Sequence, residues 1–417
     1  MLKEDYDACM IVNNNVINDP RVLKEAVTLS NNDIKVLVIG IGEEKLIKYN
    51  DYLNIVIINE NIFSRMIYYF SKKLKKISSI NSFNKKVNNN SEKLINKIKA
   101  KMNYFLKDII LILMILINNI YIVFTIKNIN AKVIHSHDLD TLLSAYVLKN
   151  KKQKLIYDAH ELWTEMSNRK YLSKIFFNKI EKYIAKKTDL IITVSNSIAK
   201  EMCERYNLNN EILLLKNIPD SDLDKDINYS THKPTKVLYQ GGYIKNRGLQ
   251  ELILAAQYLD KNIKIILRGY GNLEDKLKEM VNIYNVNDKV SFKEPVSPQN
   301  LIKYASKADI GLILYKNNSL NNKYCLPNKL FEYMHAGLAI ISNNLVEIKN
   351  LVEKNKVGLI LNNLEPENIA YTINNLAKNK NKLVKYKKNS ILISKNKYNW
   401  YIEGQKLTKN YKKLLKK

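Results

Sequence analysis

Short runs of β-branched and other apolar residues recur along the first half of the chain, each followed by a polar loop and then by apolar residues at helical spacing. Four of these runs are KVLVIG (35–40), KVIHSHD (132–138), KLIYDAHE (154–161) and LIITVS (190–195). Strands that alternate with helices are typical of βαβ units, which place their strands in one parallel sheet. We therefore predict a parallel α/β domain over residues 1–215.

A second series of the same kind occupies the second half of the chain. Its runs are KVLYQGG (236–242), IKIILRGYG (263–271), KVSFKEPV (289–296), ADIGLILY (308–315) and LAIIS (338–342). Between the two series, residues 216–235 are polar, contain two prolines and are rich in acids, which indicates an interdomain linker. The pattern predicts an α/β protein with a second Rossmann-like domain over residues 236–395 and a final helix within residues 396–417.

Residues 61–107 combine apolar positions at helical spacing with a strong positive charge. Residues 61–77 repeat large apolar side chains at helical intervals, and residues 65–107 hold twelve basic residues and one acid, Glu92. A basic amphipathic helix is typical of binding to a membrane surface, and packing on its own domain is an equal alternative. Residues 108–126 are apolar enough to raise the question of a membrane span, but Asn118 and Asn119 interrupt them, so a buried helix is favoured.

Composition adds two constraints. The chain has 417 residues, a hydrophobic fraction of 46% and a formal net charge of +28, with only six arginines among its 68 basic residues. A lysine-rich surface of this kind suits nucleic acid, anionic lipid or phosphorylated substrates. Three cysteines without C-x-x-C spacing and a start without signal-peptide features predict a cytoplasmic protein that has neither a disulfide framework nor a cysteine zinc site.

Ligands of doubly wound sheets bind outside the carboxyl ends of the strands, so the loops after the predicted strands carry the candidate chemistry. In the first of these loops, Asp19 is predicted to cap a helix that begins at Pro20. The absence of G-x-G-x-x-G argues against a dinucleotide cofactor in this domain. Arg21, at the start of the same helix, is either a surface charge or a ligand for an anion.

The motif HSHDLD (135–140) ends a predicted strand and places His135 and His137 on one face of it. His137 has three interpretations: it belongs to half of a metal site, it is a catalytic or substrate-binding residue, or it is a core histidine. The metallohydrolase pattern H-x-H-x-D-H is not completed, because Leu139 stands at its aspartate position. The next predicted strand ends in YDAHELW, which adds Asp158, His160 and Glu161. Polar residues at the ends of two successive strands predict a cleft.

Two glycine loops follow predicted strands in the second half. YQGGYIKNRGL (239–249) contains Gly241 and Gly242 and places Lys245 and Arg247 just before a helix. LRGYG repeats the arrangement with Arg268, Gly269 and Gly271. Glycines let backbone N–H groups approach an anion, and helix N-termini and cations add positive charge, so this pair of loops predicts a phosphate site.

The stretch CLPNKLFEYMHAGLAII (325–341) predicts a helix that begins after Pro327 and is closed by a glycine, followed at once by a strand. On this helix Glu332 shares a polar face with Asn328 and His335, and the opposite face is apolar. Glu332 is therefore predicted to point away from the core and toward the polar loops. The alternative is an ordinary solvated helix face.

In order along nearly the whole chain, these motifs resemble those of the retaining family 4 nucleotide-sugar glycosyltransferases of the GT-B fold, in which two Rossmann-like domains face each other across a cleft. The matching segments are NDPRVLKEA, HSHDLD, YDAHELW, YQGGYIKNRGL, LRGYG, PNKLFEYMHAGLAII and YNWYIEGQKL. The resemblance implies a metal-independent transferase that moves a sugar from a UDP- or GDP-sugar to a glycan or a lipid-linked acceptor, without a further cofactor, in the synthesis of a bacterial surface polysaccharide or glycolipid. The basic segment adds an anionic membrane surface as an expected partner, at the inner face of the plasma membrane.

The resemblance also implies roles for single residues. Glu332 would accept hydrogen bonds from the ribose hydroxyls, Arg247 with Lys245 or Lys329 would neutralise the departing diphosphate, and the terminal helix would cross back to the first domain. The expected catalytic residues are His137, Arg247 and Glu332. The expected substrate-binding residues are Asp19, Arg21, Asp138, His160, Glu161, Gly241, Gly242, Lys245, Arg268, Gly269, Gly271, Tyr324, Pro327, Asn328 and Lys329.

This sequence departs from the family pattern at two positions. The E-x7-E pattern would place a glutamate at Tyr324, and a glycine stands where an arginine is expected before Arg247, a loss for which Arg268 is the candidate replacement. Three alternatives stay open: a nucleotide-sugar epimerase of the same fold, a non-catalytic relative, for which Tyr324 is the reason, and a basic nucleic-acid-binding protein, which would explain the net charge of +28. No nucleic acid is expected as a partner, because the chain lacks a recognition motif for it.

Overall fold

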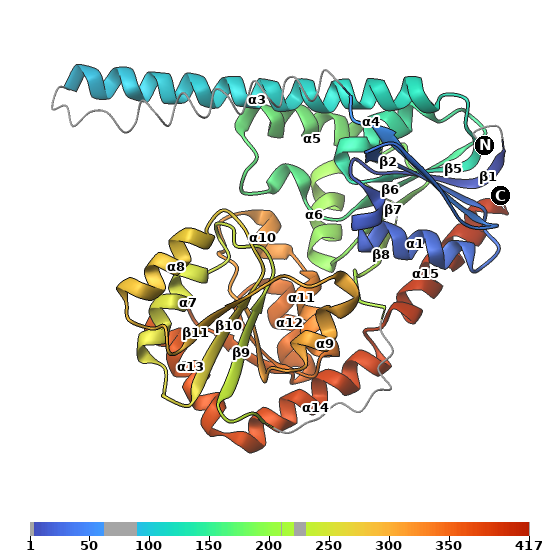
Figure 1. Cartoon of the computed structure of the whole chain (residues 1–417). Helices are drawn as coiled ribbons and strands as arrows, with labels where there is room; N and C mark the ends of the chain where they lie inside the picture. The colour runs from blue at the N-terminus through green and yellow to red at the C-terminus, as the bar shows by residue number, and fades with distance from the viewer. Residues whose placement is uncertain (1–3, 62–89, 210, 221–230, 417) are drawn as a thin grey trace. The chain divides into compact units, whose positions relative to one another are not determined.

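The computed structural model describes residues 4–61, 90–209, 211–220 and 231–416, and these divide into two compact units, each with its own sheet (Figure 1). Unit 1 consists of Met1–Thr193, Glu201–Leu213 and Leu407–Lys417. Unit 2 consists of Val194–Lys200 and Leu214–Lys406. The prediction of two parallel α/β sheets is confirmed.

The sheet of unit 1 has the strand order β3-β4-β2-β1-β5-β6-β7-β8. Its strands from β4 to β7 pair in parallel, and β3 joins β4 in the antiparallel sense at the edge. The strands are β1 (Asp5–Ile11), β2 (Val36–Gly42), β3 (Lys45–Asn50), β4 (Leu53–Asn59), β5 (Asn130–His137), β6 (Lys154–Ala159), β7 (Leu190–Thr193) and β8 (Ile212–Leu214). The four predicted strands of this half are present. The pair β3 and β4 is not predicted, because β3 is an edge strand without a buried residue and so lacks an alternating pattern.

Helices and short turns connect these strands. They are η1 (Val16–Asn18), α1 (Pro20–Ser30), α3 (Asn90–Ile126), α4 (Leu139–Leu148), η2 (Trp163–Glu165), α5 (Tyr171–Ala185) and α6 (Asn196–Tyr206). Helix α1 begins as predicted, since the Asp19 carboxylate accepts hydrogen bonds from the backbone N–H groups of Arg21 and Val22. This cap sets α1 against the carboxyl end of β1, where the polar residues of the unit gather.

Helix α3 corrects the expectation of a buried helix. It continues through Asn118 and Asn119, and its Phe105–Ile126 part is long and apolar enough to cross a membrane, but only 22% of the apolar window is buried. One side packs on α4 and α5 through Ile115, Ile122 and Ile126, while the other side is open. The basic helix predicted over 61–77 lies outside the described residues after Asn61.

The sheet of unit 2 has the order β11-β10-β9-β12-β13-β14, and all its pairs are parallel. On β9, Val237 and Tyr239 join one apolar cluster and Leu238 joins the other, so both faces of the sheet are covered. The strands are β9 (Thr235–Gln240), β10 (Ile263–Arg268), β11 (Val290–Lys293), β12 (Ile310–Ile313), β13 (Ala339–Asn343) and β14 (Gly358–Leu361), of which β14 is not predicted.

Helices connect the strands of unit 2 and follow the last of them (Figure 1). They are α7 (Leu249–Ala255), η3 (Ala256–Tyr258), α8 (Glu274–Ile283), η4 (Pro298–Asn300), α9 (Leu301–Ala305), α10 (Leu320–Tyr324), α11 (Asn328–His335), α12 (Val346–Asn355), α13 (Pro366–Lys378), α14 (Lys380–Asn396) and α15 (Trp400–Leu415). The last eleven residues of the chain, which include the end of α15, are counted with unit 1.

Candidate active site

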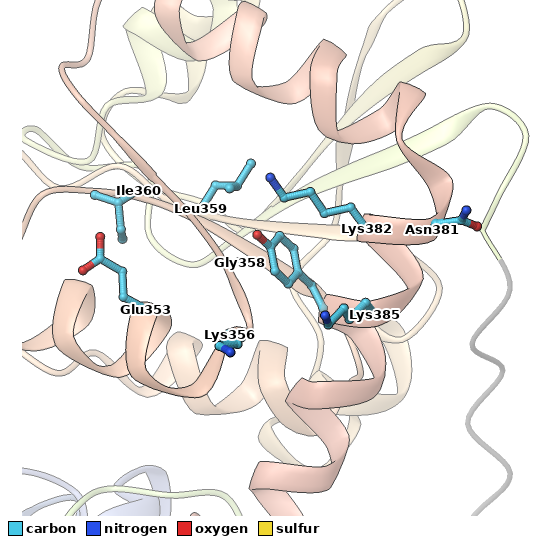
Figure 2. A pocket seen from close by; sticks show the side chains of 9 residues that line it. Glu353, Lys356, Gly358, Leu359, Ile360, Asn381, Lys382 and Lys385 are labelled. Atoms are coloured by element: carbon cyan, nitrogen blue, oxygen red, sulfur yellow. The ribbon is translucent and has the colours of Figure 1, made fainter.

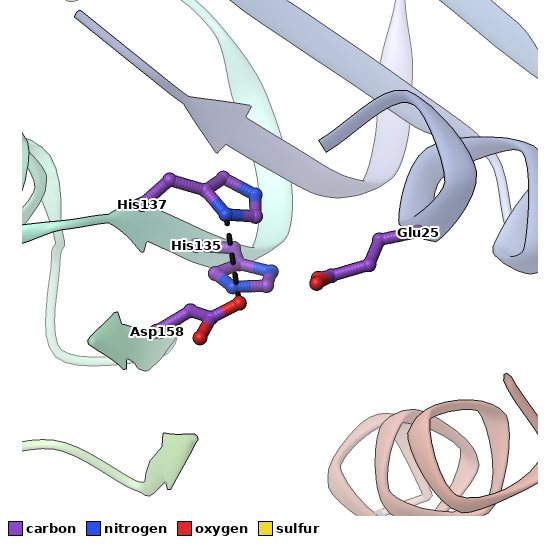
Figure 3. Close-up of side chains that lie close together, drawn as sticks. All are labelled: Glu25, His135, His137 and Asp158. Atoms are coloured by element: carbon purple, nitrogen blue, oxygen red, sulfur yellow. Dashed lines mark ion pairs between the residues drawn. The ribbon is translucent and has the colours of Figure 1, made fainter. Parts of the chain in front are cut away.

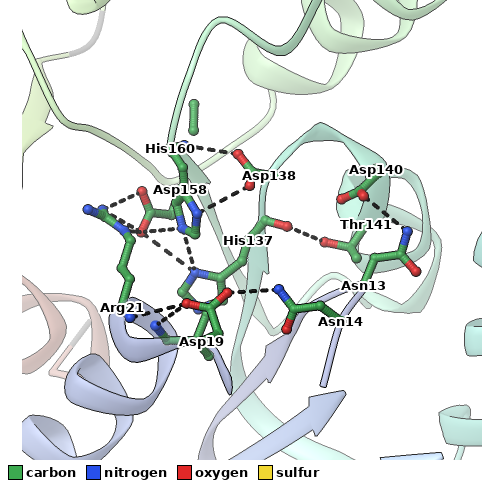
Figure 4. A network of polar contacts seen from close by, with 12 residues as sticks. Asn13, Asn14, Asp19, Arg21, His137, Asp138, Asp140, Thr141, Asp158 and His160 are labelled. Carbon is green, nitrogen blue, oxygen red and sulfur yellow. Dashed lines mark hydrogen bonds and ion pairs between the residues drawn. The ribbon is translucent and has the colours of Figure 1, made fainter. Parts of the chain in front are cut away.

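In unit 1, the predicted polar residues meet where β5 and β6 end (Figure 4). Asp138 follows β5 with φ 61° and ψ 170°, a backbone conformation that costs a non-glycine residue about 1–3 kcal/mol. Its backbone N–H donates to the Asp158 carbonyl at 2.8 Å, and its carboxylate accepts from the His160 N–H at 3.1 Å. These bonds hold the loops after β5 and β6 side by side.

His137 and His160 form a chain of polar contacts with Asp138 in this corner. His160 Nδ1 lies 3.2 Å from Asp138 Oδ2, and His160 Nε2 lies 3.1 Å from His137 Nδ1. Burial alone would lower the pKa of His160, but the carboxylates of Asp138 and Asp158 outweigh it and raise the pKa well above its usual value. A charged His160 donates from both ring nitrogens, so neutral His137 accepts at Nδ1 and carries its proton on Nε2.

His137 is fully buried, whereas the side chain of His160 is 18% exposed and that of Asp138 27%. Burial, with His135 and His160 nearby, lowers the pKa of His137 well below its usual value, which keeps the ring neutral. Of this group, His160 and Asp138 are therefore the members that solvent reaches. Glu161, the next predicted residue, is half-buried and acts electrostatically on Arg169.

Arg21 is buried rather than a surface charge, and this corrects the simpler of its two interpretations. Its guanidinium donates from Nη2 to Asp158 Oδ2 at 2.8 Å, and its Nε lies 3.0 Å from Glu25 Oε1. Burial would raise the pKa of Asp158, but Arg21 and His160 outweigh it and hold that pKa well below its usual range. Burial and the nearby Asp158 charge raise the pKa of Glu25 to about 8. Arg21 thus ties α1 to the end of β6.

Glu25, His135, His137 and Asp158 lie close enough together to raise the question of a metal ion (Figure 3). Their candidate ligand atoms lie within 4.8 Å of one another, and all four side chains are buried. However, the Arg21 guanidinium already contacts both carboxylates, and the Tyr411 hydroxyl lies 2.7 Å from His135 Nδ1. The cluster therefore already holds an internal cation, and we assign it no metal chemistry.

In unit 2, two cations and two tyrosines assemble near the end of β9. Lys329 Nζ lies 3.9 Å from the centre of the Tyr239 ring and 5.4 Å from that of Tyr315, and Arg247 Cζ lies 3.7 Å above Tyr315. Burial and the neighbouring Arg247 charge lower the pKa of Lys329 to about 7. Within the described part of the chain, neither Lys329 nor Arg247 forms a salt bridge, so both charges are available to an anion.

The glycines of the two loops let neighbouring backbone and side-chain groups approach closely. A Cβ on Gly241 (φ 136°) would lie 2.9 Å from Lys329 Nζ, and a Cβ on Gly269 (φ 147°) would lie 2.1 Å from the Gly241 carbonyl oxygen. The Gly241 N–H donates to the Arg268 carbonyl at 2.9 Å, so it bonds the neighbouring loop. Gly271 likewise allows close approach to the Tyr243 backbone. These glycines pack the loops together and make room for a lysine, whereas Gly242 is exposed.

Glu332 points toward the end of β9, as predicted. It is half-buried on α11, and its Oε2 accepts a hydrogen bond from Gln240 Nε2 at 3.0 Å. The expectation for His335 is wrong: it is fully buried on the same helix, and its Nε2 lies 2.7 Å from the Tyr398 carbonyl. The helix is buried on most of its circumference because it lies between the sheet and α14, so helical spacing alone overestimates its polar face.

The remaining predicted residues of unit 2 lie in less constrained positions. Lys245 and Asn328 are exposed, and Pro327 precedes α11 as its N-cap residue. Arg268 stacks on Tyr304 at 4.8 Å, and its buried Nε has no hydrogen-bond partner among the described residues. Tyr324 ends α10, and its carbonyl accepts from the Ser195 hydroxyl at 3.0 Å.

A cavity of about 730 Å³ also opens in unit 2, beside the edge strand β14 (Figure 2). It is lined by Glu353, Lys356, Gly358, Leu359, Ile360, Asn381, Lys382, Lys385 and Tyr386. None of the predicted site residues is among them. The lining comes from the middle of β14 and from α12 and α14 rather than from the loops at the carboxyl ends of strands, where this fold binds ligands.

Sequence reasoning missed several members of both clusters. Tyr239 lies inside a predicted strand and Tyr315 at the end of one, where an aromatic residue is most simply explained as core. Glu25 lies one turn beyond Arg21 on α1, so i, i+4 spacing was the available signal for that ion pair. Tyr411 had no local signal, because 276 residues separate it from His135.

Comparisons with known proteins agree with this architecture. The family model described as "Glycosyltransferase Family 4" matches residues 101–220, and the model described as "Glycosyl transferases group 1" matches residues 220–392. The chain is 27% identical to an uncharacterized glycosyltransferase, MJ1069 of Methanocaldococcus jannaschii, over 65% of this chain and 70% of that protein. It is 26% identical to the amylovoran biosynthesis glycosyltransferase AmsK of Erwinia amylovora, over 30% of this chain and 32% of that one.

Among solved structures, HepE of Anabaena in complex with UDP and glucose superposes with a TM-score of 0.67 and 12% identity, covering 98% of this chain and 100% of that one. This likeness shows that the fold is that of the GT-B glycosyltransferases. Together the two family models span residues 101–392, most of the chain and nearly all of unit 2. The chain therefore belongs to the group 1, family 4 glycosyltransferases, and it is a transferase enzyme.

Proposed function

We propose that this protein is a retaining glycosyltransferase that moves a sugar from a UDP-sugar to a glycan or lipid-linked acceptor. The observation that carries the proposal is the pair of basic residues Lys329 and Arg247, which form no salt bridge within the described residues and lie over Tyr239 and Tyr315 at the carboxyl edge of the unit 2 sheet. Burial and the Arg247 charge disfavour the charged form of Lys329, and the nearby Glu332 carboxylate offsets them only in part, so a bound dianion stabilises the positive charge of both residues. A nucleoside diphosphate supplies that charge.

The same pair accounts for catalysis of the transfer. When the bond between the anomeric carbon and the diphosphate breaks, negative charge develops on the departing diphosphate. The acceptor oxygen bonds to that carbon and its hydroxyl proton passes to solvent. Cations already fixed at that place stabilise the developing charge without reorganisation, and loss of one such donor typically costs about 3–4 kcal/mol of barrier. Lys329 and Arg247 thus supply positive charge from the chain itself, which is the basis for proposing a metal-independent reaction without a further cofactor.

Glu332 is proposed to bind the ribose of the donor. A carboxylate accepts two hydroxyl hydrogen bonds at once, and Gln240 Nε2 fixes its orientation through the 3.0 Å bond to Oε2. The choice of UDP over GDP is supported by HepE, whose structure contains UDP and glucose. Retention of the anomeric configuration follows from the family resemblance.

In unit 1, we propose that Asp138 and His160 bind hydroxyl groups of the acceptor. They are the exposed members of the polar corner, and buried His137 orients His160 from behind through the 3.1 Å contact between their rings. His137 is thus proposed as a positioning residue. The product class is proposed to be a bacterial surface polysaccharide or glycolipid, as the amylovoran biosynthesis enzyme AmsK suggests, with the protein in the cytoplasm at the inner face of the plasma membrane.

Transfer from radiolabelled UDP-sugars tests the donor site. Lys329→Met and Glu332→Gln are expected to lower kcat/KM at least a hundredfold, about 2.7 kcal/mol by transition-state arithmetic, because each removes a contact to the donor. Lys276→Met is the matched control, since Lys276 is an exposed lysine on α8 of the same unit and outside the predicted site, and it should keep most of the activity. Full activity of both site variants would refute the assignment. The anomeric configuration of the product, read by NMR, tests retention.

A further inference from the structure

Helix α3 presents an apolar face that the described part of unit 1 leaves uncovered. The exposed fractions of its large side chains run from 36% for Ile109 to 68% for Phe124. At 3.6 residues per turn these side chains fall in one sector about 100° wide, which is the width of a typical apolar stripe. The face consists of Phe105, Leu106, Ile109, Leu113, Ile120 and Phe124.

The opposite side of α3 is fastened to unit 1 by two buried polar residues. Asp108 Oδ2 accepts from the backbone N–H groups of Leu172 and Ser173, at 2.8 and 3.1 Å, and so caps the start of α5. Asn119 donates to the Asp140 carbonyl at 2.7 Å and accepts from the Ser144 N–H at 2.7 Å, and so bonds α4. A helix that crossed a bilayer would have to break these bonds and expose Asp108 and Asn119 to lipid.

We propose that α3 lies flat in the surface of a lipid bilayer containing anionic lipids, with its apolar face among the upper acyl chains. A helix of this kind has one apolar face and basic residues beside it. Residues 90–107, the first half of α3, contain five lysines and one acid, Glu92. This charge complements anionic headgroups, whereas a second copy of the chain is as strongly positive as this one and offers no complementary charge.

A neighbouring helix supports the lipid assignment. Helix α5, which packs on α3, also exposes Tyr171 (77%) at its first turn and Phe176 (37%). Aromatic side chains and lysines are enriched at the boundary between lipid and water. The proposal thus places the membrane surface on α3 and α5 of unit 1. It stands on the packing of α3 and does not depend on the transfer chemistry proposed above.

Vesicle flotation of the full chain tests this proposal without any donor or acceptor. The vesicles contain equal parts of phosphatidylcholine and phosphatidylglycerol, and a second set contains phosphatidylcholine alone. The test variant is Leu113→Ser/Ile120→Ser/Phe124→Ser. The matched control is Ile283→Ser/Tyr371→Ser/Leu392→Ser, which removes three similarly exposed apolar side chains from unit 2.

We expect the wild type and the control to float with the anionic vesicles, and the α3 variant to lose at least tenfold in apparent affinity. Because all six positions are exposed, the thermal midpoints of the variants should match that of the wild type, which separates loss of binding from unfolding. The proposal is wrong if the wild type stays with the soluble fraction at low salt, or if the α3 variant floats as well as the wild type. It is equally wrong if sedimentation shows a wild-type dimer that does not float and that the α3 variant dissociates.

Discussion

At the residue scale, the position of Lys329 depends on the glycine at position 241. The absence of a side chain at Gly241 leaves the space that the ammonium of Lys329 occupies above the Tyr239 ring. The positive φ of 136° at Gly241 is also one that other residues rarely adopt. From the sequence alone, Gly241 belonged to a predicted phosphate loop and Lys329 to the diphosphate site that the family resemblance implies, and their dependence on each other was not visible.

A substitution at Gly241 tests this pair. The Cβ of Gly241→Ala would displace Lys329 Nζ, so the affinity for UDP is expected to fall at least tenfold, about 1.4 kcal/mol. Isothermal titration calorimetry measures that change. Gly242→Ala is the matched control, because its Cβ would have 3.8 Å to the nearest side-chain atom, and it should bind UDP as the wild type does. Equal affinities of the two variants would contradict the role of Gly241.

The lowered pKa of Lys329 predicts a pH dependence of donor binding. Below its pKa of about 7 the side chain is charged, and above it the charge is lost in the free protein. A bound diphosphate favours the charged form, so UDP affinity should fall as the pH rises from about 7 to 9, by at most about tenfold per pH unit. Conversely, the unliganded protein should gain stability over that range, since the unfolded chain binds more protons there than the folded one.

Calorimetry in buffers of different ionisation enthalpy checks this linkage as proton uptake on UDP binding. Lys329→Arg keeps its charge throughout, so its UDP affinity should be flat over the same pH range. If the UDP affinity of the wild type is also independent of pH over this range, Lys329 does not contact the diphosphate.

At the element scale, α3 has one side that packs on the protein core and another side that is exposed. Its inner side carries Ile115 and Ile122 into the core and uses Asp108 and Asn119 to satisfy backbone groups of α5 and α4. Its outer side is apolar without a partner in the described residues of unit 1. Hydropathy alone treats both sides alike, and the sequence predicted a buried helix here because Asn118 and Asn119 interrupt the apolar run.

The contact of Asp108 with α5 makes a measurable contribution to the free energy of unfolding. Asp108→Ala leaves the first N–H groups of α5 without an acceptor, so the free energy of unfolding should fall by about 1–2 kcal/mol in chemical denaturation. Asp51→Ala, which removes an exposed ion pair with Lys48, is the control and should change it by less than about 1 kcal/mol. Since the outer face of α3 is unchanged, vesicle flotation of Asp108→Ala should equal that of the wild type, and an unaltered stability would contradict the capping role.

At the scale of the whole molecule, the chain consists of two units with separate sheets and separate polar sites. The proposed donor residues Lys329, Arg247 and Glu332 all belong to unit 2, whereas the proposed acceptor residues His160 and Asp138 belong to unit 1. A ligand that binds only one unit stabilises that unit first. Because the two proposed sites lie in different units, an experiment that resolves the two units can test donor binding and acceptor binding independently.

UDP is therefore expected to stabilise unit 2 selectively. At a hundred times its dissociation constant, a ligand adds about 2.7 kcal/mol to the stability of the folded state that binds it. Hydrogen exchange should show slower exchange in the segments around Gly241 and Lys329 and no change around β5 and β6. ATP at the same concentration serves as a control for unspecific anion binding. Slower exchange confined to unit 1 would contradict the proposal that UDP binds unit 2.

The sequence by itself determined the two parallel sheets, the cap at Asp19, the direction of Glu332 and the family. These features depend on local periodicity, on turn chemistry and on motifs that lie within a few residues of each other. The tertiary structure decided the burial of Arg21 and His335, the contact of Tyr411 with His135, the room that Gly241 makes for Lys329, and the open face of α3. Each of these depends on which distant element covers a residue, and burial by a distant element leaves no periodic trace in the chain.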